Sequence, residues 1–245
     1  MEEIMNRAQV LIEAIPYIRA FHGKTFVIKY GGHAMCDPEL KQSVMLDITL
    51  LKYLGLNPVL VHGGGPEISE LLEKLGKKSV RVQGQRVTDH ETMEVVNMVL
   101  AGKVNKELVT MLNHFGVKAA GISGQDGGLI IAAKKKLPGG EDLGFVGEVE
   151  HINPELLHTL LAKGYIPVVA TVGVGAEGEI YNINADTVAG ELAAALQAEK
   201  LIMLTDVEGI FENPADSSTL ISKVKVAKAL EMIADGRIDS GMIPK

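Results

Sequence analysis

The chain has 245 residues, of which 47% are hydrophobic and 4% aromatic, so it can bury a sizeable core made mainly of aliphatic side chains. Its formal net charge of −7 argues against bulk attraction to nucleic acid or to an anionic membrane. The single cysteine excludes an internal disulfide, the acidic opening MEEIMNRAQ is unlike a secretory signal, and no apolar run could span a bilayer. We therefore expect a soluble cytoplasmic protein with no nucleic-acid or membrane partner.

Residues 1–22 predict a helix that is separate from the pattern of the remaining chain. Ile4, Ala8, Leu11 and Ile15 fall at helical spacing and give this helix one apolar face. Such a face can pack on the helix's own domain or dock on another subunit. The sequence alone leaves both interpretations open.

Short aliphatic runs then alternate with longer amphipathic stretches. Because the runs are continuously apolar, they are typical of strands buried on both faces, as in a parallel sheet. The predicted strands are residues 25–30, 57–62, 117–122, 165–172 and 200–206, and the predicted helices are residues 37–54, 66–75, 91–100, 105–115, 154–163 and 186–198. Residues 128–134 and 145–152 predict an excursion in antiparallel strands. The alternation predicts an α/β fold, a three-layer sandwich in which helices cover a mainly parallel central sheet.

Two apparent ligand motifs do not point to a site. The segment GVGAEG, residues 173–178, matches the glycine spacing of a dinucleotide-binding loop, but no helix opens directly after it. We therefore interpret it as a hairpin turn. The seven histidines show no metal-ligand spacing, so we expect no metal site built from histidine side chains.

Two of the predicted strands carry a polar residue at or next to their last position, directly before a glycine-rich loop. Lys29 precedes Gly31 and Gly32, and His62 precedes the run Gly63–Gly65, after which a proline begins a helix. In open α/β sheets the carboxyl ends of the strands lie together and hold the ligand. Glycines there allow backbone N–H groups to approach an anion, although glycine after a strand is often only a turn. The two loops together favour phosphate chemistry.

Three further polar residues are candidates for binding an acidic ligand. Arg86 lies between short β-like residues, and a guanidinium can hold a carboxylate through paired hydrogen bonds. Asn182 and Asn184 alternate along an extended segment and so share one face. Asp186 stands near the start of the following helix, where helix capping is the simplest interpretation.

Six segments, read together, resemble the acetylglutamate kinases of the amino acid kinase family. They are KYGGHAM, VHGGGPEI, GQRVTD, YNINAD, LTDVEGI and DSGMIPK, and they occur in order over essentially the whole chain. The resemblance implies the amino acid kinase fold and a phosphotransferase with a carboxyl group as acceptor. That reaction is the ATP-dependent phosphorylation of the side-chain carboxylate of N-acetyl-L-glutamate, the second step of arginine biosynthesis, with Mg²⁺ bound through the nucleotide phosphates.

The resemblance also assigns roles to residues of this chain. Lys29 and Lys245 match the lysines that stabilise the moving phosphoryl group, and Asp186 matches the carboxylate that holds both lysines. The matches to acetylglutamate contacts are Gly64, Gly65, Arg86 and Asn182. The matches to nucleotide-binding residues are Gly31, Gly32, Asp206, Val207, Glu208, Gly209, Ile210, Phe211, Arg237, Ile238 and Asp239. The implied division is an N-terminal helix (1–22), an acetylglutamate-binding and dimerisation lobe (23–198) and a nucleotide-binding lobe (199–245).

The ends of the chain carry two further expectations. Family members continue past the lysine of GMIPK, so we expect a truncated chain with an incomplete C-terminal lobe. The opening helix resembles that of hexameric, arginine-sensitive members, which implies homodimers or hexamers joined through this helix. Two alternatives remain: a related kinase acting on glutamate, aspartate or carbamate, and a truncated homologue that binds without catalysis. The segments RVTD and NINAD disfavour the first, and retention of Lys29, Asp186 and Lys245 disfavours the second.

Overall fold

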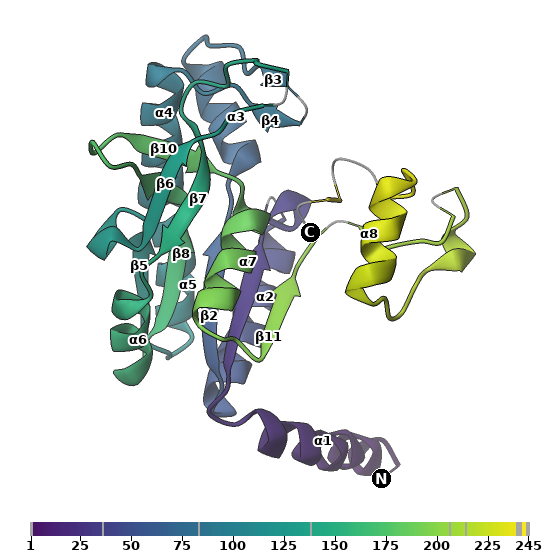
Figure 1. Ribbon diagram of the computed structural model, residues 1–245. Coiled ribbons are helices and arrows are strands. Elements are labelled where there is room, and N and C mark those ends of the chain that lie inside the picture. The colour runs from purple at the N-terminus through teal and green to yellow at the C-terminus, as the bar shows by residue number, and fades with distance from the viewer. Residues whose placement is uncertain are drawn as a thin grey trace.

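The computed structural model describes residues 2–35, 37–82, 84–137, 139–205, 207–213, 215–238 and 242–243. Within these residues the elements follow the predicted βα alternation (Figure 1). No helix among the described residues is long and apolar enough to cross a membrane.

Five parallel strands form the central sheet. Their order is β11 (Lys200–Met203), β1 (Thr25–Tyr30), β2 (Asn57–His62), β8 (Ile166–Ala170) and β5 (Ala119–Ser123). The register aligns Tyr30 with His62 and His62 with Ala170, so these three strands end at one edge of the sheet. The parallel sheet predicted from the aliphatic runs is therefore confirmed.

Helices cover both faces of this sheet, which gives the three predicted layers. Ile28 and Leu60 pack on one face, in the core that contains α2 (Pro38–Tyr53), α3 (Gly65–Lys74), α4 (His90–Asn97) and α5 (Asn105–His114). Val27 and Val59 pack on the other face, in the core that contains α6 (Glu155–Ala162) and α7 (Ala185–Ala195). Because side chains alternate along a strand, Lys29 shares the face of Val27 and lies on the side of α7.

The predicted helices 91–100 and 105–115 are one continuous helical stretch, which corrects the expected break between them. A π-helical segment, η2 (Met98–Val104), joins α4 directly to α5. Gly102 lies inside this π-helical segment, and the chain remains helical through it.

A second, smaller sheet lies beside the end of the central one. Strands β10 (Ile180–Ile183), β7 (Val146–Ile152), β6 (Ile130–Lys134) and β9 (Val172–Val174) close into a four-stranded barrel. β6 and β7 are antiparallel, as predicted, and β9 and β10 form an antiparallel pair around the GVGAEG segment, which confirms the hairpin turn. The predicted strand 165–172 is divided at Thr171, because β8 belongs to the central sheet and β9 to the barrel.

The first and last helices lie away from these two sheets. α1 (Glu2–Phe21) projects from one end of the central sheet and exposes apolar side chains, among them Val10, Leu11 and Ile15. α8 (Val226–Ala234) and the loops around it stand beside β11 (Figure 1). The remaining elements are the hairpin strands β3 (Arg81–Val82) and β4 (Gln85–Arg86) and the short 3₁₀ helices η1 (Gly32–Met35), η3 (Asp126–Gly128) and η4 (Ser217–Thr219).

Candidate active site

Lys29 and Asp186 meet at the carboxyl edge of the central sheet. The Nζ atom of Lys29 lies 2.9 Å from Oδ1 of Asp186, and the two side chains are 11% and 12% exposed. The contact has the distance of an ion pair but not the angles of a hydrogen bond, so Oδ1 lacks a hydrogen-bond donor. The ammonium on strand β1 therefore has a counter-charge from the first turn of α7.

Asp186 does not cap α7, which corrects the simplest interpretation of its position. The N-cap is Asn184, whose side-chain oxygen accepts hydrogen bonds from the backbone N–H groups of Asp186 and Thr187 at 2.8 and 3.1 Å. Asparagine suits this position because its oxygen satisfies N–H groups that have no partner inside the helix. The cap leaves the carboxylate of Asp186 available to Lys29.

The glycines after β1 leave room for the lysine head group. A Cβ atom added to Gly31 would lie 2.9 Å from Nζ of Lys29, which is closer than real Cβ contacts. Gly32 has φ +76°, a conformation that favours glycine. A side chain at either position would therefore displace the lysine or strain the turn.

The second glycine loop begins helix α3 and closely approaches the π-helical segment. Gly64 is the N-cap of α3, and a Cβ atom added there would lie 2.7 Å from Cδ2 of Leu100. The first residues of α3 and α7 both line the same pocket. Helix N-termini present unpaired backbone N–H groups, so this edge is suited to an anion.

A buried network of hydrogen bonds from His62 and Asn105 fixes the start of the loop Gly63–Gly65. His62 is fully buried, its Nδ1–H donates to the carbonyl of Gly63 at 2.9 Å, and its Nε2 accepts from the side-chain amide of Asn105 at 3.1 Å. Asn105 also donates to the carbonyl of Val168 at 2.8 Å, so one amide joins α5 to two strands. Burial lowers the pKa of His62 to about 4, the bond to Gly63 opposes this shift, and the charge of Lys106 adds to it. The imidazole is therefore neutral at pH 7.

All four predicted acetylglutamate contacts, Arg86 among them, line one pocket. The pocket has a volume of about 210 Å³, and its lining includes Gly64, Gly65, Arg86, Asn182 and Asn184. The guanidinium of Arg86 is buried and donates to the carbonyl of Gly65 at 2.9 Å, to Oγ of Ser69 at 2.8 Å and to Oγ of Ser79. These contacts hold the cation at the pocket wall.

Thr88 links two of these residues, although it was not among the predicted site residues. Its buried hydroxyl donates to the carbonyl of Arg86 at 2.9 Å and accepts from the side-chain amide of Asn182 at 3.3 Å. The threonine of the RVTD segment therefore fixes the pocket wall rather than the ligand. The signal for it is local: a hydroxyl two residues after an arginine, on the same side of an extended chain.

A second pocket lies between α2, β11 and the α8 region. It has a volume of about 720 Å³ and is lined mainly by apolar side chains. Five of the predicted nucleotide residues line it, namely Val207, Glu208, Gly209, Ile210 and Ile238. Phe211 does not line it, and forms an isolated bridge with Leu220 instead.

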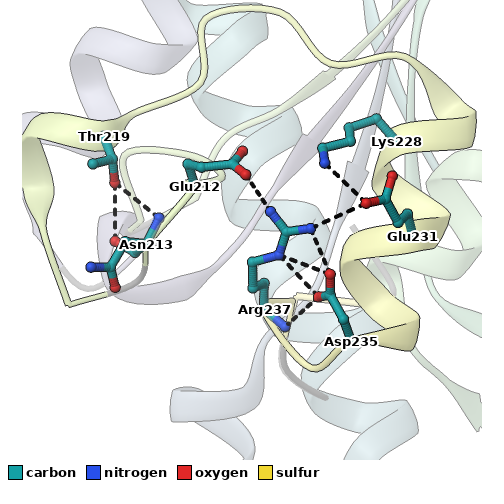
Figure 2. A network of polar contacts seen from close by, with 7 residues as sticks. All are labelled: Glu212, Asn213, Thr219, Lys228, Glu231, Asp235 and Arg237. Carbon is teal, nitrogen blue, oxygen red and sulfur yellow. Dashed lines mark hydrogen bonds and ion pairs between the residues drawn. The ribbon is translucent and has the colours of Figure 1, made fainter.

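Arg237 is held by acidic side chains beside α8 (Figure 2). Its guanidinium contacts Asp235 through Nε at 3.0 Å, Glu231 through Nη2 at 3.6 Å, and Glu212 through Nη1. Hydrogen bonding to Asp235, and then the negative charges of Asp235, Glu212 and Glu231, raise the pKa of Arg237 above its ordinary value. In this structure Arg237 joins the loop at Glu212 to the end of α8 and does not line the second pocket.

Three predicted site residues, Lys245, Asp206 and Asp239, lie outside the described residues. Their roles stay predictions from the resemblance.

Comparisons with known proteins agree with one another. The sequence pattern of the amino acid kinase family matches residues 24–245. An acetylglutamate kinase of Halothermothrix orenii is 56% identical over 246 residues, which cover 100% of this chain and 85% of that protein. One of Moorella thermoacetica is 57% identical over 248 residues, covering 98% and 84%. A solved structure of N-acetylglutamate synthase from Neisseria gonorrhoeae, complexed with coenzyme A and N-acetyl-glutamate, has a TM-score of 0.80 at 25% identity and covers 96% of this chain and 52% of that one.

Proposed function

The chain belongs to the acetylglutamate kinases of the amino acid kinase family, and on that premise we propose that it transfers the γ-phosphoryl group of ATP to the side-chain carboxylate of N-acetyl-L-glutamate. The observation that carries the proposal is the buried ion pair between Lys29 and Asp186 beside a pocket that contains a buried arginine. The names of the relatives support this substrate over glutamate, aspartate or carbamate.

The chemistry explains why the pair is a lysine and an aspartate rather than a general base. A carboxylate with a pKa near ~4.3 is already ionised at neutral pH, so no proton needs to be removed from it. The difficulty is repulsion between an anionic acceptor and an anionic triphosphate. Phosphoryl transfer depends on positioning and on neutralising the charge of the equatorial oxygens, which a fixed ammonium does.

Each residue of the proposed site has a defined part in this reaction. Lys29 stabilises the phosphoryl group in transfer, and Asp186 holds the lysine in place. The amides of Gly31 and Gly32 approach the phosphate, because the loop has no side chains there. Arg86 binds the α-carboxylate of N-acetyl-L-glutamate, with Asn182, Gly64 and Gly65 around the rest of the substrate.

The nucleotide binds in the apolar pocket beside β11. The side chains of Val207, Ile210 and Ile238 line this pocket and form a wall suited to an adenine base. We assign residues 199–245 to the nucleotide-binding lobe, as the resemblance implies. When bound, Mg²⁺ would be held through the phosphates of ATP and would reduce their negative charge. Lys245, Asp206, Arg237 and Asp239 are assigned to this side through the resemblance alone. We further propose a cytoplasmic homodimer, or a hexamer joined through α1.

The test is an ADP-release assay run with N-acetyl-L-glutamate, L-glutamate, L-aspartate and carbamate, together with trapping of the acyl phosphate as a hydroxamate. We expect ADP and hydroxamate in equal amounts with N-acetyl-L-glutamate and little of either with the other acceptors. Turnover with one of the other acceptors alone would replace the proposed substrate. Binding of N-acetyl-L-glutamate without ADP release would favour a non-catalytic homologue.

A further inference from the structure

A second arginine lies at the mouth of the pocket that contains Arg86. Arg81 on β3 is paired with Arg86 on β4 across the hairpin, and both line the pocket. Nη1 of Arg81 donates to the carbonyl of Gly84 at 2.9 Å, which closes the hairpin turn. Nη2 lies on the pocket side, because a Cβ atom added to Gly65 would be 3.7 Å from it.

Neither guanidinium has a carboxylate partner within the part of the chain that the structure describes. By contrast, Lys77 lies a few residues earlier and pairs with both Asp89 and Glu91. Burial, and then the positive charge of Arg81, lower the pKa of Arg86 to about 10. Two adjacent cations without a counter-charge, in a chain whose formal net charge is −7, are an unfavourable arrangement that an anionic ligand would relieve.

The two arginines differ in how their donors are used. Arg86 is buried and already donates to Gly65, Ser69 and Ser79, so protein contacts fix its position. Arg81 is exposed, and its Nη2 donates to no atom among the described residues. Arg81 therefore has hydrogen-bond donors left for a ligand, and Arg86 supplies a fixed charge beside them.

We propose that Arg81 is a specificity-determining residue, which together with Arg86 favours an N-acylated amino acid over the free amino acid. This inference rests on the proposed function. In N-acetyl-L-glutamate the group beside the α-carboxylate is a neutral amide. In L-glutamate the group at the same place is an ammonium, which two neighbouring guanidiniums repel.

The experiment compares the wild-type enzyme with Arg81→Gln, Arg81→Lys and Lys78→Gln. Lys78→Gln is the matched control, because it removes one exposed positive charge close by in the chain from a residue that does not line this pocket. The measured quantities are kcat, KM for N-acetyl-L-glutamate, and Ki of L-glutamate as a competitive inhibitor. The ratio of Ki to KM gives the discrimination between acylated and free substrate.

For Arg81→Gln we expect KM for N-acetyl-L-glutamate to rise about tenfold with kcat nearly unchanged, and Ki of L-glutamate to stay constant or fall. The discrimination ratio should therefore fall about tenfold. Arg81→Lys should restore part of it, because the charge returns without the planar fork. Lys78→Gln should match the wild type, and added salt should narrow the gap between the wild type and Arg81→Gln.

Three outcomes would overturn the inference in distinguishable ways. An unchanged KM in Arg81→Gln would remove Arg81 from the site. Equal rises in KM and in Ki would make Arg81 a general carboxylate contact without a role in specificity. A wild-type enzyme that shows no turnover dependent on N-acetyl-L-glutamate would overturn the proposed function itself, and this inference with it.

Discussion

The two pockets of this molecule are built in different ways. The pocket that contains Arg86 lies at the end of strand β2, in a central sheet whose strands β1 and β2 are buried from their second residue to their last. The apolar pocket beside β11 stands on a region where, among the described residues from 199 to 243, only Met232 and Ile238 are buried. The surroundings of the first pocket are held by strand pairing and a buried core. The surroundings of the second are exposed loops, which ion pairs of Arg237 connect to α8 without lining the pocket.

This contrast indicates which part of the site is preorganised. Well-packed elements open only with the global unfolding of a protein, whereas regions with few buried contacts open at lower free energy. An ammonium that stabilises a transition state has to be held in place before the reaction. Lys29, which we propose touches the moving phosphate, is therefore expected to be preorganised on the buried side, and the region that admits and releases the nucleotide is expected on the exposed side.

The largest expected effect concerns Lys29. Lys29→Ala should lower kcat by about 10²–10³-fold with little change in KM for N-acetyl-L-glutamate, because the lost charge acts in the transition state. Steady-state ADP release measures both parameters. The double variant Lys29→Met with Asp186→Asn removes both charges, so it should remain folded yet stay as slow as the single variant. A double variant that regains turnover would show that Lys29 has a structural role only.

A variant of Arg86 tests the part of the buried region that is proposed to bind the acidic substrate. Arg86→Ala should raise KM for N-acetyl-L-glutamate by roughly 10–100-fold and leave KM for ATP unchanged, because the lost contact is to the acidic substrate. Initial-rate kinetics with each substrate varied in turn would separate the two constants. A KM for N-acetyl-L-glutamate that stays constant would remove Arg86 from the site.

His62 should make the stability of the protein depend on pH. Its pKa is about 4 in the folded chain and 6.5 in the unfolded one, so the unfolded chain binds the extra proton between these values. The stability that the neutral imidazole contributes is therefore complete above pH 6.5 and is lost as the pH falls towards 4. Between pH 7 and pH 5 the loss should be about 2 kcal/mol of unfolding free energy.

Urea unfolding at the two pH values measures this loss. His62→Gln keeps a donor and an acceptor but does not titrate, so its stability should change less between pH 7 and pH 5 than that of the wild type. Equal pH dependence in both proteins would mean that other groups cause the acid sensitivity.

The smallest effect is expected on the exposed side. Arg237→Ala removes the link between Glu212 and α8, and should raise KM for ATP roughly threefold while KM for N-acetyl-L-glutamate and the unfolding midpoint stay nearly constant, because exposed ion pairs contribute little to stability. Lys228→Ala is the control, because Lys228 pairs with Glu231 on the same helix without reaching Glu212. A large loss of stability in Arg237→Ala would contradict the contrast between the two regions.

The sequence predicted the central sheet well because its signal is local. Continuous aliphatic runs such as residues 25–30 and 57–62 fix strand bounds, and the strands match these bounds. The junctions were less accurate. The split of residues 165–172 between two sheets depends on which partner strand each half meets, and the π-helical joint at Met98–Val104 depends on packing across the molecule.

The residues that hold the site were harder to predict than the residues expected to bind substrate. Asp186 stands where a cap is usual, yet Asn184 supplies the cap, and the difference depends on Lys29 from a distant strand. Asn105 and Thr88 act on residues 43 and 94 positions away, namely His62 and Asn182. Contacts at such sequence separation leave no periodic pattern for a single sequence to display.

The π-helical segment between α4 and α5 has a consequence for insertions and deletions. A regular helix turns about 100° per residue, so the additional residue in the wide turn sets the rotation of α5 relative to α4. Leu100, which lies against Gly64, is in the π-helical segment, and Asn105, which reaches His62, is the first residue of α5. The wide turn therefore sets the direction of Asn105 relative to that of Leu100. Shortening the turn by one residue would give a more regular helix and rotate one of these side chains away from the glycine loop. The irregular turn therefore allows Leu100 to lie against Gly64 and Asn105 to reach His62 from one continuous helix.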